Sequence, residues 1–332
     1  MITAYRFLPP KNGAADTLRL EPTQLQPDDA IPPDAVWIDL LEPTRDEERK
    51  AEAFAGIDLP TIEEMDEIEP SELLYSESDA RYMTIRVLCL AKTNRPKIAN
   101  ISFVRKGRVL VTVRYDDPKP FALFAQRAQR NGVPAQNPDA ILIGLVDTIV
   151  GRAAEILRTS GDRIDELSEQ VFEQTDQTRR ESESYQRVLT TLGREGARIS
   201  KVRESLISVE PMLRFAAPVE PGKEDEEPPG HVGTMLRDIT SLEAHTEYLL
   251  GKIQFLLDAM LGLVNLRQND IIKLLSVITV VLTPPTFFAS MYGMNFKNMP
   301  EYDWSYGYQY ALVLMLLSAV LPYLYFRWKR WL

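Results

Sequence analysis

The sequence predicts an α+β cytoplasmic domain followed by a long stalk helix and two transmembrane helices. Three observations lead to this fold class. Short segments rich in β-branched residues are concentrated before Asp117, and long helical periodicity dominates after it. Two apolar runs of about 20 residues then close a chain in which 26% of residues are charged.

Composition limits the function. The net charge is −10 and the pI is about 5.0, which argues against a nucleic-acid partner. One cysteine, Cys89, excludes an internal disulfide and fits a reducing compartment. With two histidines and no Ser-His-Asp or Cys-His constellation, we expect neither an enzyme nor a cofactor.

Residues 1–135 are expected to form the cytoplasmic α/β domain. The strand candidates are Ile2–Leu8, Thr17–Leu20, Val36–Leu41, Arg81–Ala91, Ile98–Arg105 and Arg108–Tyr115. The short helix candidates are Thr44–Ala55, Pro60–Ile68 and Pro118–Asn131.

Residues 136–230 are expected to form long antiparallel helices, over Asp139–Thr178 and Arg179–Ala217. Prolines and acids in Ala217–Pro229 indicate a linker or a helix-hairpin tip. A third helix begins near Val232 with no breaker before Pro284. At about 50 residues it would be about 75 Å long, which suits a stalk that runs directly into the membrane.

The stalk segment, residues 231–291, continues into the first span at about 271–291. An external loop follows at 292–307, then the second span at 308–326 and a basic tail at 327–332. A buried hairpin in a soluble core is the alternative. Basic residues flank the ends of the two spans that lie away from the connecting loop, so the positive-inside rule places both termini in the cytoplasm. These residues are Arg267, Lys273, Arg327, Lys329 and Arg330.

One face of the stalk is polar along its whole length. Steps of four and three, which keep residues on one side of a helix, trace it. Its members are Asp258, Gly262, Asn265, Asn269, Ile272, Ser276, Thr279, Thr283, Thr286 and Ser290. Small polar residues of this kind suit either helix–helix contact or a water-filled path. The continuation below the membrane to Asn265, Asn269 and Asp258 favours the path, which would need several copies of the chain around an axis.

Two features of this face suggest ion passage. Ile272 and Leu275 could form an apolar ring that closes the path by dewetting. At the external end lies Tyr292-Gly293-Met294-Asn295-Phe296, which brings an uncharged amide to the membrane mouth. Because Mg²⁺ releases its waters reluctantly, amides, carbonyls and hydroxyls that bind the hydrated ion weakly suit its transit better than carboxylates do. No phosphate-binding loop is present, so uptake is expected to be passive.

Several short segments near the C-terminus occur together. They are Leu236-Arg237-Asp238-Ile239, Asn269-Asp270-Ile271-Ile272-Lys273, Leu282-Thr283-Pro284-Pro285-Thr286, Tyr292–Phe296, Met299-Pro300-Glu301 and Pro322–Phe326 with Trp331-Leu332. In this combination Met235–Leu332 resembles the bacterial CorA magnesium transporters. The resemblance implies a homopentameric funnel in the membrane that takes up Mg²⁺, and also Co²⁺ and Ni²⁺.

The resemblance also implies roles for individual residues. The selectivity filter would comprise Gly293, Met294 and Asn295, the pore lining Thr279, Thr283, Thr286, Ser290, Asn269 and Asp258, and the hydrophobic gate Ile272 and Leu275. Asn295 and Asp258 would contact the metal. Lys297 stands where many relatives look acidic, so Glu301 and Asp303 would attract cations to the mouth. Asp238 and the acid-rich stretch Glu63–Glu77 are the candidates for regulatory Mg²⁺ binding.

Two alternatives remain open at this point. A Zn²⁺ transporter could have the same architecture, although Met294 and the Met-Pro-Glu segment favour Mg²⁺. A membrane-tethered scaffold or sensor without a pore is the other.

Overall fold

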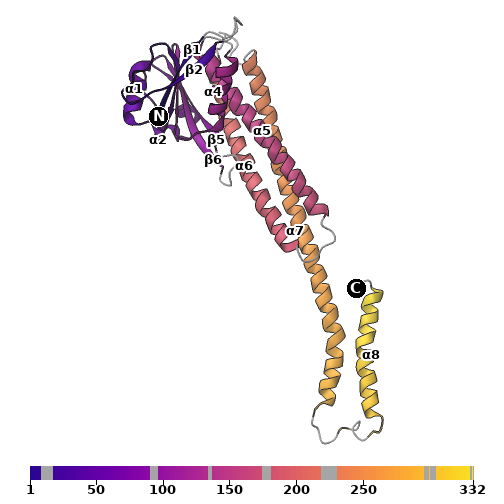
Figure 1. Ribbon diagram of the computed structural model, residues 1–332. Helices are drawn as coiled ribbons and strands as arrows, with labels where there is room; N and C mark the ends of the chain where they lie inside the picture. Colours follow the sequence, from indigo (N-terminus) through magenta and orange to yellow (C-terminus); the bar gives the residue numbers. More distant parts are fainter. Residues whose placement is uncertain are drawn as a thin grey trace. The chain divides into compact units, whose positions relative to one another are not determined.

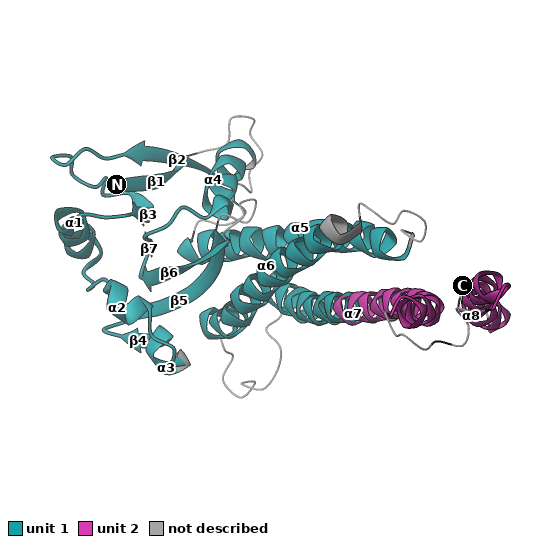
Figure 2. Cartoon of the chain, turned by 90° about the horizontal axis from the view of Figure 1, so that it is seen from below, with its two compact units in different colours: residues 1–256 teal, residues 257–332 magenta. Residues whose placement is uncertain are grey.

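The computed structural model describes residues 1–8, 18–89, 96–133, 137–173, 181–217, 230–294, 299, 304–329 and 331. Two compact units divide the chain, Met1–Leu256 and Leu257–Leu332 (Figure 2). The boundary falls inside one continuous helix, α7 (His231–Tyr292). Each unit is therefore described by itself below.

The first unit contains a seven-stranded sheet with the order β2-β1-β3-β7-β6-β5-β4 (Figure 1). Its strands are β1 (Ile2–Leu8), β2 (Arg19–Gln24), β3 (Ala35–Leu41), β4 (Leu74–Glu77), β5 (Ala80–Cys89), β6 (Lys97–Lys106) and β7 (Val109–Arg114). Within the described chain β3 and β7 pair in parallel, and the other neighbouring strands are antiparallel.

Two expectations for this region need correction. The second strand extends to Gln24 rather than ending at Leu20, because Pro22 lies on an edge strand, where a missing N–H does not interrupt the ladder. The single helix expected over Pro60–Ile68 is instead α2 (Ile62–Met65), followed after a break by α3 (Pro70–Leu73). Thr61 caps α2 in a capping box with Glu64.

Both faces of the sheet are covered. Helix α1 (Arg45–Ala55), capped by Thr44, packs on a core that includes Ile38, Leu40 and Val111. The opposite face carries Trp37, whose ring lies 5.8 Å from that of Phe124 in α4 (Lys119–Asn131). Because alternate residues of a strand point to opposite faces, the central strands are apolar on both sides.

The remaining helices of the first unit are α5 (Pro138–Glu173), α6 (Glu181–Ala216) and the beginning of α7. Between α5 and α6 the buried Ser160 hydroxyl donates to Glu195 at 2.8 Å. Helix α7 packs beside α5, where Gly161 lies close to the Leu249 side chain. Tertiary packing of this kind supplies most of the stability of long helices.

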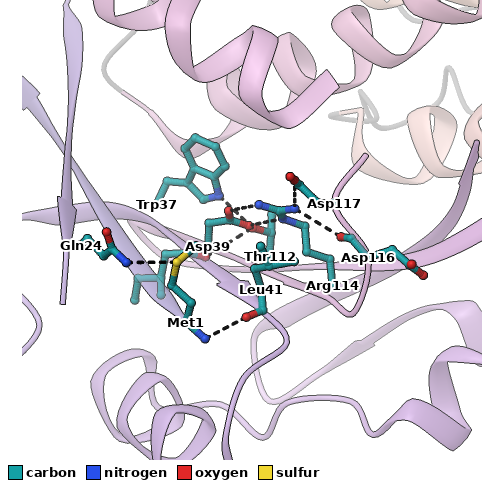
Figure 3. Close-up of polar contacts among 10 residues, drawn as sticks. Met1, Gln24, Trp37, Asp39, Leu41, Thr112, Arg114, Asp116 and Asp117 are labelled. Atoms are coloured by element: carbon teal, nitrogen blue, oxygen red, sulfur yellow. Dashed lines mark hydrogen bonds and ion pairs between the residues drawn. The ribbon is translucent and has the colours of Figure 1, made fainter. Parts of the chain in front are cut away.

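A buried ion pair joins β3 to β7 (Figure 3). Arg114 donates through Nε and Nη2 to the two carboxylate oxygens of Asp39, at 3.0 and 2.8 Å, and both side chains are only 6% exposed. Thr112 donates to the same carboxylate at 2.7 Å and accepts from the Trp37 indole at 3.0 Å. Burial alone would lower the pKa of Arg114, but hydrogen bonds to Asp39 and Asp117 outweigh it and raise this pKa, so the guanidinium stays charged.

The second unit consists of the remainder of α7 and helix α8 (Gly307–Trp328). Helix α7 continues through Pro284 and Pro285 to Tyr292. Each proline removes one backbone hydrogen bond, and membrane helices tolerate this more readily than soluble ones.

Candidate functional site

The polar face of α7 is exposed along its length in the single chain. Every member from Asp258 to Ser290 is exposed, including the two apolar members of the expected gate, Ile272 at 53% and Leu275 at 58%. At Gly262 an added Cβ would meet no atom within 4 Å. The structure thus places all the expected pore-lining and gate residues on one helix, with their side chains exposed in the single chain.

The threonine hydroxyls on this face are oriented by their own helix. Thr279 donates to the carbonyl of Leu275 at 2.9 Å, and Thr286 donates to the carbonyl of Leu282 at 2.8 Å. Because each hydroxyl hydrogen is used within the helix, the oxygen lone pairs remain available as acceptors. These two side chains can therefore accept hydrogen bonds from the waters of a hydrated cation.

The chain turns sharply where α7 ends. Gly293 donates its N–H to the carbonyl of Ala289 at 3.0 Å, and a Cβ at this position would lie only 3.1 Å from the same oxygen. The close approach favours glycine here, because a side chain would force the Ala289 carbonyl to shift by a few tenths of an ångström. Met294 follows, exposed, with its N–H 3.3 Å from the Met291 carbonyl oxygen. Asn295, Glu301 and Asp303 lie outside the described residues.

Acidic residues on α7 do not assemble a metal centre within one chain. In the described ranges no group of three or more His, Cys, Asp or Glu side chains is arranged to hold a metal ion. Asp238, the candidate regulatory residue, is exposed on α7 in the first unit and lines a groove of about 630 Å³.

Sequence reasoning missed this groove. Helices α4, α5 and α7 form it, and Arg127, Asp147 and Arg152 contribute charge to it. Arg127 binds Asp147 at 3.3 Å and Thr148 at 2.9 Å. No local sequence signal could have indicated it, since its walls come from three separate segments.

Two helices are long and apolar enough to cross a membrane, α7 and α8. Only 6% of the apolar window in each is buried. A hairpin in a soluble core would be mostly buried, so the alternative of a core hairpin is inconsistent with the structure.

The comparisons with known proteins agree with this architecture. Residues 33–330 match the family of CorA-like Mg2+ transporter proteins. The chain is 34% identical over 304 residues to the magnesium transport protein CorA of Haemophilus ducreyi, covering 90% of this chain and 92% of the relative. It is also 34% identical over 302 residues to the CorA of Salmonella typhimurium, with the same coverage.

Solved structures show the same fold at lower sequence identity. The complete CorA magnesium transporter from Methanocaldococcus jannaschii superposes with a TM-score of 0.75 at 17% identity, covering 100% of this chain and 99% of that one. The full-length CmaX protein superposes with a TM-score of 0.64 at 16% identity, covering 97% and 93%. The expected fold class, an α+β domain with a long helix and two membrane helices, is confirmed. Given the match over residues 33–330 and the level of identity to its relatives, the chain belongs to the family of CorA-like Mg2+ transporters.

Proposed function

We propose that this protein is a passive channel for Mg²⁺ that also admits Co²⁺ and Ni²⁺. It assembles as a homopentamer in a bacterial inner membrane, with both termini in the cytoplasm. The observation that carries the proposal is the continuous exposed polar face of α7, which leads from Asp258 to the turn at Gly293. Such a face suits an aqueous axis, which several copies of the chain around one axis would supply.

The ion travels with its waters. Thr279 and Thr286 present acceptor oxygens because their hydrogens are used by the helix, and the outer hydrogens of a hydrated Mg²⁺ are donors. Such contacts recognise the hydrated ion without stripping it, so binding stays weak enough for release. Asn295 extends the same chemistry to the external mouth, where Glu301 and Asp303 raise the local cation concentration.

The membrane potential supplies the driving force. An inside-negative potential of about 100 mV contributes about 4.6 kcal/mol for a divalent ion. On the cytoplasmic side, Asp258 receives the ion. We further propose that Asp238, exposed in the groove of the first unit, contributes to a regulatory Mg²⁺ site completed by a neighbouring subunit.

The path can be tested by cysteine accessibility. Cysteines at positions 279, 283 and 286 are expected to react with a water-soluble, membrane-impermeant thiol reagent. Mg²⁺ flux should decrease as the fraction of labelled cysteine increases. Val281 and Phe288 lie on the opposite side of the helix, so cysteines there are the matched controls and should stay unreacted. Equal labelling of both sets, or none at the threonine positions, would contradict the path.

The native cysteine should not interfere with this experiment. Cys89 is buried in β5, and burial, followed by the charge of Asp116, raises its pKa to about 12. The thiolate is the reactive form, so Cys89 should not react with the thiol reagent below about pH 10 in the folded protein. Unfolding in denaturant should restore rapid labelling, which checks that the reagent is active.

The gate gives a further prediction. Leu275→Asn is expected to raise resting Mg²⁺ flux about tenfold, equivalent to about 1.4 kcal/mol, because a polar ring stays wet. Leu274→Asn is the matched control, since this neighbour is also exposed but lies about 100° around the helix from Leu275. Flux into proteoliposomes with an Mg²⁺-sensitive dye measures both, and an equal effect of the two variants would refute the assignment of Leu275.

The same vesicles separate Mg²⁺ from the alternative ion. The curated relatives are named magnesium transport proteins, so Zn²⁺ as the principal ion is not favoured. Zn²⁺ flux without Mg²⁺ flux would reverse this order, and no metal flux at all would favour a scaffold or sensor.

A further inference from the structure

The cytoplasmic-end turn of α8 carries exposed aromatic and basic side chains on one side. The Lys329 ammonium lies 5.7 Å from the centre of the Tyr325 ring. The Trp328 ring centre lies 6.4 Å from that of Tyr325. Tyr325 is 51% exposed and Trp328 is 79% exposed. Steps of three and four residues place the three side chains on one side of the helix.

The position of the ammonium is informative. Lys329 could extend away from the helix end, but it lies over a ring one turn back toward the apolar part of α8. A cation–π contact holds it there. The ammonium thus lies at the same level along the helix axis as the exposed rings. Aromatic side chains at the end of a membrane helix lie at the level of the lipid headgroups.

Among the described residues, neither Lys329 nor Arg327 forms an ion pair with a carboxylate, although many other basic residues of this chain do. Hydrogen-bond donors are also present in this turn, in the Tyr325 hydroxyl and the Trp328 indole N–H. A positive charge, two donors and two apolar ring surfaces at headgroup depth suit an anionic amphiphile.

We propose that Tyr325, Trp328 and Lys329 form a binding site for the phosphate group of an anionic phospholipid. The ammonium binds the phosphate as a point charge, and the hydroxyl and indole donate to its oxygens. The glycerol backbone and the upper acyl chain lie on the two rings. A zwitterionic headgroup binds less well, because its own cation offsets the attraction of Lys329.

Arg327 provides a matched control. It carries the same charge in the same turn, but it is two residues from both Tyr325 and Lys329, about 200° around the helix. A diffuse attraction to an anionic surface would involve both residues equally. A defined site involves Lys329 alone.

The test uses the purified full-length protein in a mild nonionic detergent. Its thermal unfolding midpoint is measured during titration with dioctanoyl phosphatidylglycerol, dioctanoyl phosphatidylcholine or glycerol 3-phosphate. Phosphatidylglycerol is expected to raise the midpoint in a saturable manner. Lys329→Gln should raise the concentration for half-maximal stabilisation about fivefold, and Arg327→Gln should change it less than twofold.

Two further variants keep the result interpretable. Tyr325→Phe keeps the ring under Lys329 and loses only the hydroxyl donor, so it should weaken binding about threefold, whereas Tyr325→Leu loses both and should weaken it at least as much as Lys329→Gln. Equal losses for Lys329→Gln and Arg327→Gln would overturn the site in favour of diffuse attraction. Equal stabilisation by glycerol 3-phosphate would show a free-phosphate site instead, and a response to phosphatidylcholine as strong as that to phosphatidylglycerol would also overturn the proposal. The measurement does not depend on ion flux, so its result tests the lipid site independently of the proposed channel activity.

Discussion

Asn295→Ala is expected to lower Mg²⁺ influx at least about 100-fold while leaving the assembled protein intact. In the proposed ring of five subunits the change removes five amides that would contact the hydrated ion. Each neutral hydrogen bond contributes about 0.5–1.5 kcal/mol net, so the ring as a whole contributes several kcal/mol. About 2.7 kcal/mol already corresponds to a 100-fold change.

The neighbourhood offers a matched control for this prediction. Asn298→Ala removes the same side chain three residues later, outside the Gly293-Met294-Asn295 tripeptide, and should change influx less than threefold. Influx is measured in proteoliposomes at a fixed inside-negative potential, with the oligomer checked by light scattering. If Asn295→Ala conducts like wild type, the filter lies elsewhere on the chain.

Asn295→Asp distinguishes selection of the hydrated ion at position 295 from simple attraction of cations to that position. A carboxylate binds the hydrated ion more tightly and slows its release, so affinity for Mg²⁺ should rise while maximal flux falls. If maximal flux rises instead, the position attracts ions but does not select them.

The membrane part of this protein could be predicted from sequence because its signals are local. A long apolar run, interrupted by Pro284 and Pro285 and ending at Tyr292-Gly293, indicates a membrane helix and its end without any tertiary information. The spacing of Thr279, Thr283 and Thr286 likewise specifies a face, since helical geometry is fixed. What these residues contact depends on neighbouring chains, and that remains a proposal.

The soluble unit was less predictable for a physical reason. Strand β4 (Leu74–Glu77) is short and half-exposed, so its existence depends on pairing with β5 rather than on its own pattern. The buried partnership of Asp39 and Arg114 joins residues 75 positions apart, and nothing in the local sequence of either indicates it. The tight packing at Gly293, where an added Cβ would lie 3.1 Å from the Ala289 carbonyl oxygen, likewise becomes visible only in the folded chain.

Arg114→Met is expected to lower the free energy of unfolding by about 3–5 kcal/mol, because it leaves the Asp39 carboxylate buried without its cation. The two residues pair across β3 and β7, the parallel strands at the middle of the sheet, so the loss affects the centre of the first unit. Thr112 still donates one hydrogen bond to the carboxylate, but a single neutral donor cannot offset the burial of a charge. The guanidinium also lies 4.7 Å from the Phe121 ring centre, and that contact disappears as well.

Urea unfolding of the full-length protein in detergent, followed by tryptophan emission, measures the effect. Trp304, Trp328 and Trp331 are replaced by Phe in every protein compared, so that Trp37 alone emits. Trp37 is a direct reporter because its indole donates to Thr112, one bond away from Asp39. Arg158→Met is the surface control, since Arg158 and Asp162 form an ion pair whose side chains are 73% and 66% exposed. Exposed pairs contribute about 0–1 kcal/mol, so this variant should unfold close to wild type.

The double variant Asp39→Leu with Arg114→Met distinguishes the contribution of the pair from the penalty of breaking it. Replacing both members of a buried ion pair with apolar residues is often neutral, because neither charge is then left without a partner. We therefore expect the double variant to recover at least half of the stability that Arg114→Met loses. If the double variant instead unfolds as readily as Arg114→Met, the ion pair itself stabilises the sheet. If Arg114→Met is as stable as the Arg158→Met control, the contact between β3 and β7 depends on the surrounding apolar packing and not on these charges.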